Sequence, residues 1–173
     1  AHDTELFIRE LSIEKPLVVG FSDGGITALL LAMTRSDLLS GIIACGANTS
    51  PDAFTFSCRR EIKKAYKAKC SSGEFQKDLD TVSSEIFAQT GELEKLMLTE
   101  PDISTVALSH IKVPALILAG ENDVVKSSDT KKTASAIPNS RMEILPGENH
   151  ESYVIHSTKL EKYIRDFTCS YSE

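Results

Sequence analysis

Short apolar segments recur along the chain, and each is followed by glycine or by polar residues. They are "LVVGFS" (17–22), "LLSGIIACGAN" (centred on 41–46), "VPALILAGEND" (113–123) and "RMEILPG" (141–147). Short runs that are apolar on both faces are typical of strands buried in a parallel sheet. The pattern therefore predicts four strands, of which the first three are buried.

Segments with helical spacing of apolar residues lie around these strands. They cover residues 3–13, 24–35, 127–137 and 151–167. We expect Asp3 or Thr4 to cap the first of these helices, and Ser127 or Ser128 to cap the third. Strands that alternate with helices predict an α/β fold, with a mostly parallel sheet and helices on both of its faces.

The middle of the chain has a different character, because residues 50–110 are rich in lysine and glutamate. Helical spacing is present in "RREIKKAYKAKC" and in "EFQKDLDTVSSEIFAQ", and Gly73 and Gly91 interrupt the helical pattern. We predict a small helical insertion at about residues 50–105, within a single domain of residues 1–173. Four lysines of this insertion form a predicted solvated face: Lys63, Lys64, Lys67 and Lys69.

Polar residues stand directly after three of the predicted strands. The first strand runs into the G-x-S-x-G sequence Gly20-Phe21-Ser22-Asp23-Gly24, the third ends at Asp123, and the fourth is followed by His150. Ligands of open parallel sheets bind beyond the carboxyl ends of the strands. We therefore expect these side chains to meet at one edge of the sheet and to form a nucleophile elbow with its partners.

Each of these residues suits a role in nucleophilic catalysis by a serine. A serine hydroxyl needs an adjacent base, which His150 can supply, and Asp123 can orient the imidazole and stabilise its cation. Gly20 and Gly24 are expected where a side chain would clash in the sharp turn. The following helix directs N–H groups toward a developing oxyanion, and the backbone N–H of Asp23 is the predicted first donor.

Other residues are weaker candidates for the same site. Glu121 is an alternative to Asp123 as the acid. Phe21 and Asp23, on either side of Ser22, are the predicted substrate-binding residues. Asp23 either binds a cationic group such as an amine or is only a residue of the turn with no role in binding. The remaining histidines are assigned no catalytic role: His2 is near the terminus, His110 at the end of a helix, and His156 within the last helix.

Composition narrows the classes of function. The 173 residues are 41% hydrophobic and carry a net charge of −6, which argues against nonspecific nucleic-acid binding and against an anionic membrane surface. No uninterrupted apolar run approaches the length of a spanning helix. The four cysteines show neither CxxC spacing nor nearby histidine pairs, so we expect free thiols in a reducing cytoplasm, with no metal site and no disulfide framework.

The segments "GFSDGGITALLLA", "IKVPALILAGENDVV" and "IPNSRMEILPGENHESY" resemble those of the α/β-hydrolase superfamily. They are similar to its small esterase or peptidase-like branch, which includes valacyclovir-hydrolase-like enzymes. The resemblance implies that Ser22 is the nucleophile, Asp123 the acid and His150 the base of a cofactor-free enzyme. It also implies a small-molecule ester or amide as substrate and a helical cap over the site.

The family's sheet has further strands before the elbow strand, and two βαβ units would need roughly 60 residues. Only 16 residues precede Leu17 here, so the sequence matches the C-terminal part of the fold. We expect a bare edge at residues 17–22, in a fragment of a longer protein or in a homodimer paired through that edge. The resemblance also leaves the second oxyanion donor unassigned. The alternatives are a perhydrolase (haloperoxidase), or a catalytically weak chain that acts as a binding or oligomerising module.

Overall fold

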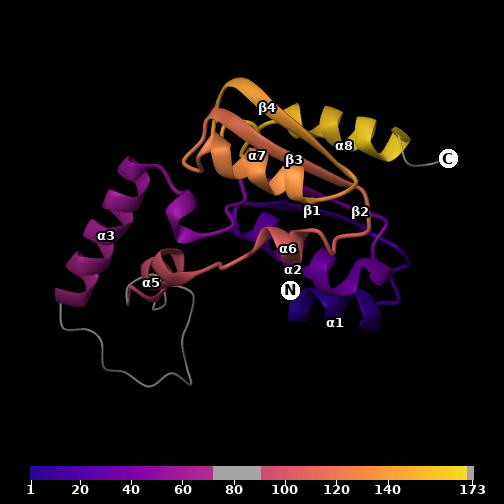
Figure 1. The fold of residues 1–173 in the computed structure, drawn as a ribbon, viewed down its shortest axis with the longest axis horizontal. Coiled ribbons are helices and arrows are strands. Elements are labelled where there is room, and N and C mark those ends of the chain that lie inside the picture. The colour runs from indigo at the N-terminus through magenta and orange to yellow at the C-terminus, as the bar shows by residue number, and fades with distance from the viewer. Residues whose placement is uncertain (72–90, 171–173) are drawn as a thin grey trace.

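Four parallel strands form the centre of the molecule (Figure 1). The structure is a computed structural model that describes residues 1–71 and 91–170. The strands are β1 (Leu17–Phe21), β2 (Gly41–Cys45), β3 (Ala115–Asn122) and β4 (Ser140–Asn149), in the spatial order β1-β2-β3-β4. The predicted α/β fold with a parallel sheet is therefore confirmed.

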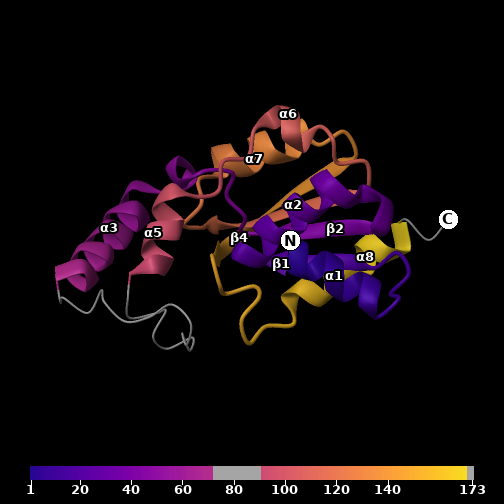
Figure 2. The same cartoon turned by 90° about the horizontal axis from the view of Figure 1, so that it is seen from below.

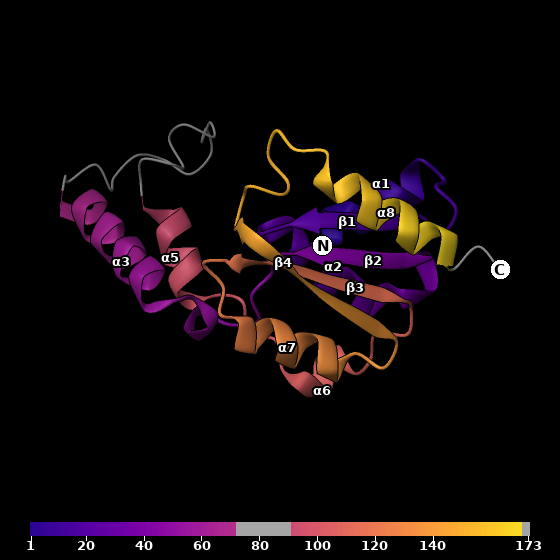
Figure 3. The same cartoon turned by 90° about the horizontal axis from the view of Figure 1, so that it is seen from above.

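Helices cover both faces of this sheet, as Figures 2 and 3 show. The described helices are α1 (His2–Glu10), α2 (Asp23–Arg35), α3 (Phe56–Ser71), α5 (Glu92–Thr99), α6 (Thr105–Leu108), α7 (Ser127–Ala136) and α8 (Lys159–Ser170). Two short 3-10 turns, η1 (Ser36–Leu38) and η2 (Pro51–Ala53), follow α2 and β2. None of the helices within the described residues is long and apolar enough to cross a membrane.

Alternate residues of the central strands face two separate cores. Ile42 of β2 packs with side chains of α2, α6 and α7 on one face, whereas Ile43 packs with α8 on the other. Every residue of β2 is buried, as its unbroken apolar run predicts. The period of two along a strand thus explains why one short segment supports helices on both sides.

Parallel pairing brings the carboxyl ends of the strands to one edge of the sheet. Phe21 pairs with Cys45, and Cys45 pairs with Leu118. Between β3 and β4 the register shifts near Gly120, where an added Cβ would lie only 2.5 Å from the carbonyl oxygen of Glu148. This irregularity shapes the backbone next to the segment that carries His150.

The helices α3 and α5 project beyond this edge (Figure 1). They pack against each other, and Lys69 of α3 donates a 2.6 Å hydrogen bond to Glu94 of α5. The helix predicted in "RREIKKAYKAKC" is therefore confirmed as α3. Gly73 and the helix predicted in "EFQKDLDTVSSEIFAQ" lie outside the described residues.

The predicted helix caps are wrong. Helix α1 begins at His2 with Ala1 as N-cap, so Asp3 and Thr4 lie inside its first turn. Acidic side chains in that turn stabilise the positive end of the helix dipole without acting as caps. Helix α7 has Lys126 as N-cap, and both Ser127 and Ser128 are already helical.

The last helix begins later than the sequence predicts. Residues 151–156 form turns, and α8 starts only at Lys159. The side-chain oxygen of Asn149 accepts hydrogen bonds from the N–H groups of Glu151 and Ser152, and this competes with helix formation. His156 was expected within the helix, but it lies exposed in the turn with φ 52°.

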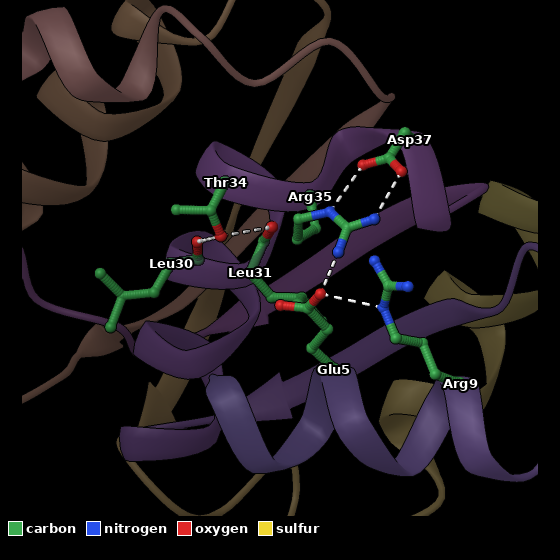
Figure 4. Close-up of polar contacts among 7 residues, drawn as sticks. All are labelled: Glu5, Arg9, Leu30, Leu31, Thr34, Arg35 and Asp37. Carbon is green, nitrogen blue, oxygen red and sulfur yellow. Dashed lines mark hydrogen bonds and ion pairs between the residues drawn. The ribbon is translucent and has the colours of Figure 1, made fainter.

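An ionic cluster joins α1 to the end of α2 (Figure 4). Arg35 donates to both carboxylate oxygens of Asp37, at 2.9 and 2.7 Å, and it also binds Glu5. Glu5 accepts a further bond from Arg9, at 3.0 Å. The hydrogen bonds between Arg35 and Asp37 raise the pKa of the guanidinium and lower the pKa of the carboxyl group. The cluster thus fixes α1 beside α2.

Strand β1 forms one edge of the sheet, because among the described residues it pairs only with β2. The prediction that β1 is buried on both faces is wrong, because Val19 is 39% exposed. Several other large apolar residues of the first 21 positions are also exposed: Leu6, Phe7, Leu11 and Ile13. An unpaired apolar edge of this kind is a template for pairing with another chain.

We propose that this edge pairs with the β1 edge of a second copy. Val19→Lys should then convert a dimer of the isolated chain into a monomer, because a charged side chain blocks edge-to-edge pairing. Sedimentation equilibrium measures the change. Val106→Lys, at an exposed position of α6, is the matched control and should leave the dimer intact. A wild-type chain that stays monomeric across the concentration range would contradict the proposal.

Candidate active site

Ser22 occupies the sharp turn between β1 and α2. Its backbone has φ 54° and ψ −117°, a conformation that costs free energy in a residue with a Cβ. Two hydrogen bonds hold the turn: Ser22 N–H donates to the carbonyl of Cys45 at 2.8 Å, and the carbonyl of Ser22 accepts from Ile26 N–H at 3.0 Å. The strained residue is thus bonded to β2 on one side and to α2 on the other.

The glycines around Ser22 have unequal roles. A Cβ on Gly20 would lie 2.0 Å from the carbonyl oxygen of Gly24, so only glycine fits there. The same expectation for Gly24 is wrong, because a Cβ added at that position would meet nothing within 4 Å beyond its chain neighbours and the backbone of its own helix. The close approach occurs at Gly25 instead, where an added Cβ would lie 3.0 Å from the Cβ of Ala47 and 3.2 Å from the carbonyl oxygen of Cys45.

The structure brings Ser22, His150 and Asp123 together. His150 Nε2 lies 3.2 Å from Ser22 Oγ, and His150 Nδ1 lies 2.7 Å from Asp123 Oδ1. The Asp123 side chain is 1% exposed and that of His150 is 17% exposed. These contacts link residues up to 128 positions apart in the chain.

Backbone donors stabilise the buried carboxylate of Asp123. Oδ1 accepts from Val125 N–H at 2.9 Å, and Oδ2 accepts from Gly120 N–H at 3.3 Å. Burying a carboxylate is costly unless hydrogen bonds of this kind satisfy it. With its proton on Nδ1, His150 would donate to Asp123, and Nε2 would be free to accept from the Ser22 hydroxyl.

Two residues confine the imidazole of His150. The ring of Phe21 lies 4.9 Å from it, centroid to centroid, and is tilted by 44°. Gly46 has φ 60°, and a Cβ at this position would lie 2.8 Å from His150 Cε1. Phe21 therefore contacts the imidazole; its contact with a substrate stays a prediction. The part played by Gly46 has no sequence signal beyond a glycine after a strand.

A network in the turn after β4 holds the backbone on both sides of His150. Asn149 N–H donates to Ser152 Oγ at 2.9 Å, and that hydroxyl donates to Glu148 at 2.6 Å. Glu148 also binds Lys159, and this contact, followed by that of Ser152, lowers the pKa of its carboxyl group. Sequence reasoning missed these residues, because they act through a turn that was predicted to be helical.

The weaker candidates fall elsewhere. Glu121 accepts from Gly147 N–H at 2.8 Å and makes no described contact with His150. His2, His110 and His156 are exposed, and none of them is among the hydrogen-bond partners given for Ser22 or Asp123 in the described part of the chain. The geometry therefore favours Asp123 over Glu121 as the partner of His150.

Asp23 is the first residue of α2. The first N–H groups of a helix have no partner within the helix and can bind an anion. Asp23 lines a cavity of about 340 Å³ between α2 and α5. Its apolar wall consists of Ile26, Leu30, Phe54, Leu96, Met97 and Pro101, and its polar groups belong to Asp23, Thr27, Asn48 and Glu100.

A larger hollow of about 450 Å³ lies at the opposite ends of the strands, beside Ile13 and Leu38. It contains none of the candidate residues, whereas Asp23 lines the smaller cavity. The cysteines are free, and burial raises the pKa of the Cys45 thiol to about 12, which keeps it protonated. Within the described residues no cluster of side chains suits a metal ion.

Comparison with curated proteins gives two relatives. The chain is 26% identical to serine hydrolase BPHL of Homo sapiens and 24% identical to that of Mus musculus. Each alignment covers 96% of this chain and 59% of the relative, so the chain spans about three fifths of their length. No family model matches the chain. The resemblance inferred from the sequence is therefore confirmed at low identity.

Solved structures with similar folds include the putative non-heme bromoperoxidase BpoC of Mycobacterium tuberculosis H37Rv, with a TM-score of 0.72 at 19% identity. The match covers 99% of this chain and 73% of that one. An enol-lactonase of Burkholderia xenovorans LB400 gives 0.66 at 19% identity, covering 96% and 70%. An alpha/beta fold family hydrolase of Bacillus anthracis gives 0.64 at 21% identity, covering 98% and 72%. The chain thus has the α/β-hydrolase fold.

The glycine geometry makes a paired prediction. Gly20→Ala should destabilise the protein by several kcal/mol, about 3 or more, because its Cβ would overlap backbone that cannot move aside. Gly24→Ala should be neutral or raise the free energy of unfolding by up to about 1 kcal/mol, because alanine is the better helix former. Urea denaturation of both variants measures the difference. Equal destabilisation by the two would contradict this account of the turn.

Proposed function

We propose that this chain carries the catalytic part of a serine hydrolase that cleaves a small-molecule ester or amide through an acyl-enzyme. The observation that carries the proposal is the chain of contacts from Ser22 Oγ to His150 Nε2 at 3.2 Å, and from His150 Nδ1 to Asp123 at 2.7 Å. It stands at the carboxyl ends of a parallel sheet, where such folds bind ligands.

The geometry gives each residue of this proposal a role. His150 takes the proton of the Ser22 hydroxyl as Oγ attacks the carbonyl carbon of the substrate. Asp123 keeps the proton on Nδ1 and stabilises the imidazolium that forms. His150 then gives the proton to the leaving alcohol or amine. A water molecule attacks the acyl-enzyme in the same way, and the acid is released with Ser22 regenerated.

The oxyanion of each tetrahedral intermediate would lie at the start of α2. Asp23 N–H is the proposed donor, and the helix dipole adds to its effect. One lost donor of this kind typically costs about 2.7–4 kcal/mol of transition-state stabilisation. A second donor is not assigned to any described residue, so the rate of the isolated chain should be low.

The comparisons support the class of reaction. The curated relatives are named serine hydrolases, and one similar structure is an enol-lactonase. The bromoperoxidase neighbour keeps the perhydrolase alternative in view, in which the same acyl-enzyme reacts with peroxide. No described feature of the site favours that reaction over hydrolysis, so hydrolysis is the function we propose.

A fluorophosphonate probe tests the proposal, because it reacts with an activated serine and not with an ordinary one. Wild type should be labelled on Ser22, and Ser22→Ala should lose the label. Ser128→Ala, at an exposed serine of α7, is the matched control and should react like wild type. His150→Gln and Asp123→Asn should each slow labelling by about 10³ or more. Absence of Ser22 labelling in wild type would favour the binding-module alternative.

The charges around the cavity make a second prediction about substrates. Among the described residues, its lining holds the carboxylates of Asp23 and Glu100 and no lysine, arginine or histidine. We propose that Asp23 binds a cationic group of the substrate, such as an amine. Asp23→Asn keeps the backbone N–H but removes the charge, and it should lower kcat/KM about tenfold for an amine-bearing ester relative to its neutral isostere.

Steady-state kinetics with the two esters measures this ratio. Asp102→Asn, an exposed carboxylate two residues from Glu100, is the control for the general effect of charge and should leave the ratio unchanged. A fall of equal size for both esters would assign Asp23 to the turn alone.

A further inference from the structure

Asp129 of α7 carries a buried carboxylate that the proposed reaction does not use. The residue is 8% exposed. Its Oδ2 accepts from Thr49 N–H at 2.8 Å, and its Oδ1 accepts from Thr49 Oγ1 at 2.6 Å. Burying a carboxylate is costly unless hydrogen bonds satisfy it. Here both oxygens bind one residue that lies 80 positions earlier in the chain.

Thr49 in turn contacts the other end of the helical insertion. It is fully buried, and its carbonyl accepts a hydrogen bond from Ile103 N–H at 2.9 Å. Thr49 directly precedes the predicted insertion, and Ile103 lies where the chain returns from α5. One residue therefore joins α7 to both ends of the segment that carries α3 and α5.

The N-terminal end of the insertion is also hydrogen-bonded to the start of α7. Lys126 N–H donates to the carbonyl of Ala53, and Thr55 N–H donates to the carbonyl of Val124, both at 2.8 Å. Lys126 is the N-cap of α7, and its carbonyl accepts from Asp129 N–H at 2.9 Å. Figure 3 shows α7 beside the point where the chain leaves the sheet toward α3. These hydrogen bonds thus attach the insertion to the start of α7.

The same residues adjoin the cavity and His150. Asn48 and Pro101 both line the cavity; Asn48 precedes Thr49, and Pro101 stands two residues before Ile103. On the other side, Gly46 lies against the imidazole of His150. A shift of Thr49 would therefore move two walls of the cavity together, while Ser22 and its turn are held separately by β2 and α2.

We propose that Asp129 is a positioning residue that acts through Thr49: it fixes both ends of the helical insertion and so sets the shape of the cavity beside Ser22. This inference rests on the proposed function, because it assigns the cavity to the substrate. It predicts an effect on substrate binding that exceeds the effect on the chemical step.

Substitutions in this pair separate the two effects. Asp129→Asn places an NH₂ group against a Thr49 donor, and Thr49→Val removes the hydroxyl that Asp129 accepts from. Each should raise KM about tenfold for an ester whose acyl group fills the cavity, with kcat changed less than about twofold. KM for an acetyl ester, which is too small to fill the cavity, should hardly change.

Two further variants control for the loss of a buried hydroxyl. Thr49→Ser keeps the hydroxyl and should restore wild-type KM. Thr133→Val on α7 removes a fully buried hydroxyl that has no hydrogen-bond partner in the described structure, and it should leave KM unchanged. If Thr133→Val raised KM as much as Thr49→Val, a general loss of packing would explain the result and the proposal would be wrong.

Amide hydrogen exchange tests the same contact without any catalysis. Exchange at the amides of Thr49 and Ile103 should accelerate about tenfold or more in Asp129→Asn, with the β1–α2 turn unaffected. Unchanged protection at both amides, or a fall in kcat at constant KM, would overturn the proposal. Failure of Ser22 labelling in wild type would instead remove the proposed function, and the exchange result would still decide whether Asp129 holds the insertion.

Discussion

The close contact between Gly20 and the carbonyl of Gly24 is the constraint on which the site depends. Strand β1 can turn directly into α2 only because no side chain stands between them at this point. The turn forces Ser22 to a positive φ, and its hydrogen bond to Cys45 anchors the strained residue on the neighbouring strand. Ser22 then presents its hydroxyl at the edge of the sheet, next to a helix N-terminus and within reach of His150.

The rest of the site follows from the register of the parallel strands. Because β1, β2, β3 and β4 all end at the same edge, residues far apart in the chain arrive within hydrogen-bond distance. Supporting groups then set the orientation: Val125 N–H fixes the carboxylate of Asp123, and Gly46 and Phe21 confine the imidazole. The insertion adds a cavity on the α2 side, lined in part by Asn48, which directly precedes Thr49. The placement of Ser22 and His150 and the shape of the cavity therefore depend on different parts of the chain.

The sequence predicts the features that depend on local patterns. Apolar runs locate the four strands, and the G-x-S-x-G motif locates the turn with Ser22, because neighbouring residues decide both. It fails where a distant partner decides: Gly25 rather than Gly24 is the glycine that lies close to the side chain of Ala47 and the carbonyl of Cys45. The late start of α8 is caused by the turn that Asn149 stabilises. The apolar residues of this segment have helical spacing, so the sequence pattern does not reveal the turn. The bond between Asp129 and Thr49 has no local signature at all, since 80 positions separate the two residues.

The physical costs at the strand ends bear on the choice between a catalyst and a binding module. A serine at positive φ and a carboxylate with 1% exposure both cost free energy, and neither contributes to the packing of the two cores. A module that only bound a partner through the β1 edge would need neither, since glycine at position 22 and an apolar residue at 123 would relieve both costs. The arrangement makes physical sense if the hydroxyl must point outward and the imidazole must be held in one tautomer. Those are the requirements of an acyl-transfer reaction, and they favour hydrolysis over the binding-module alternative.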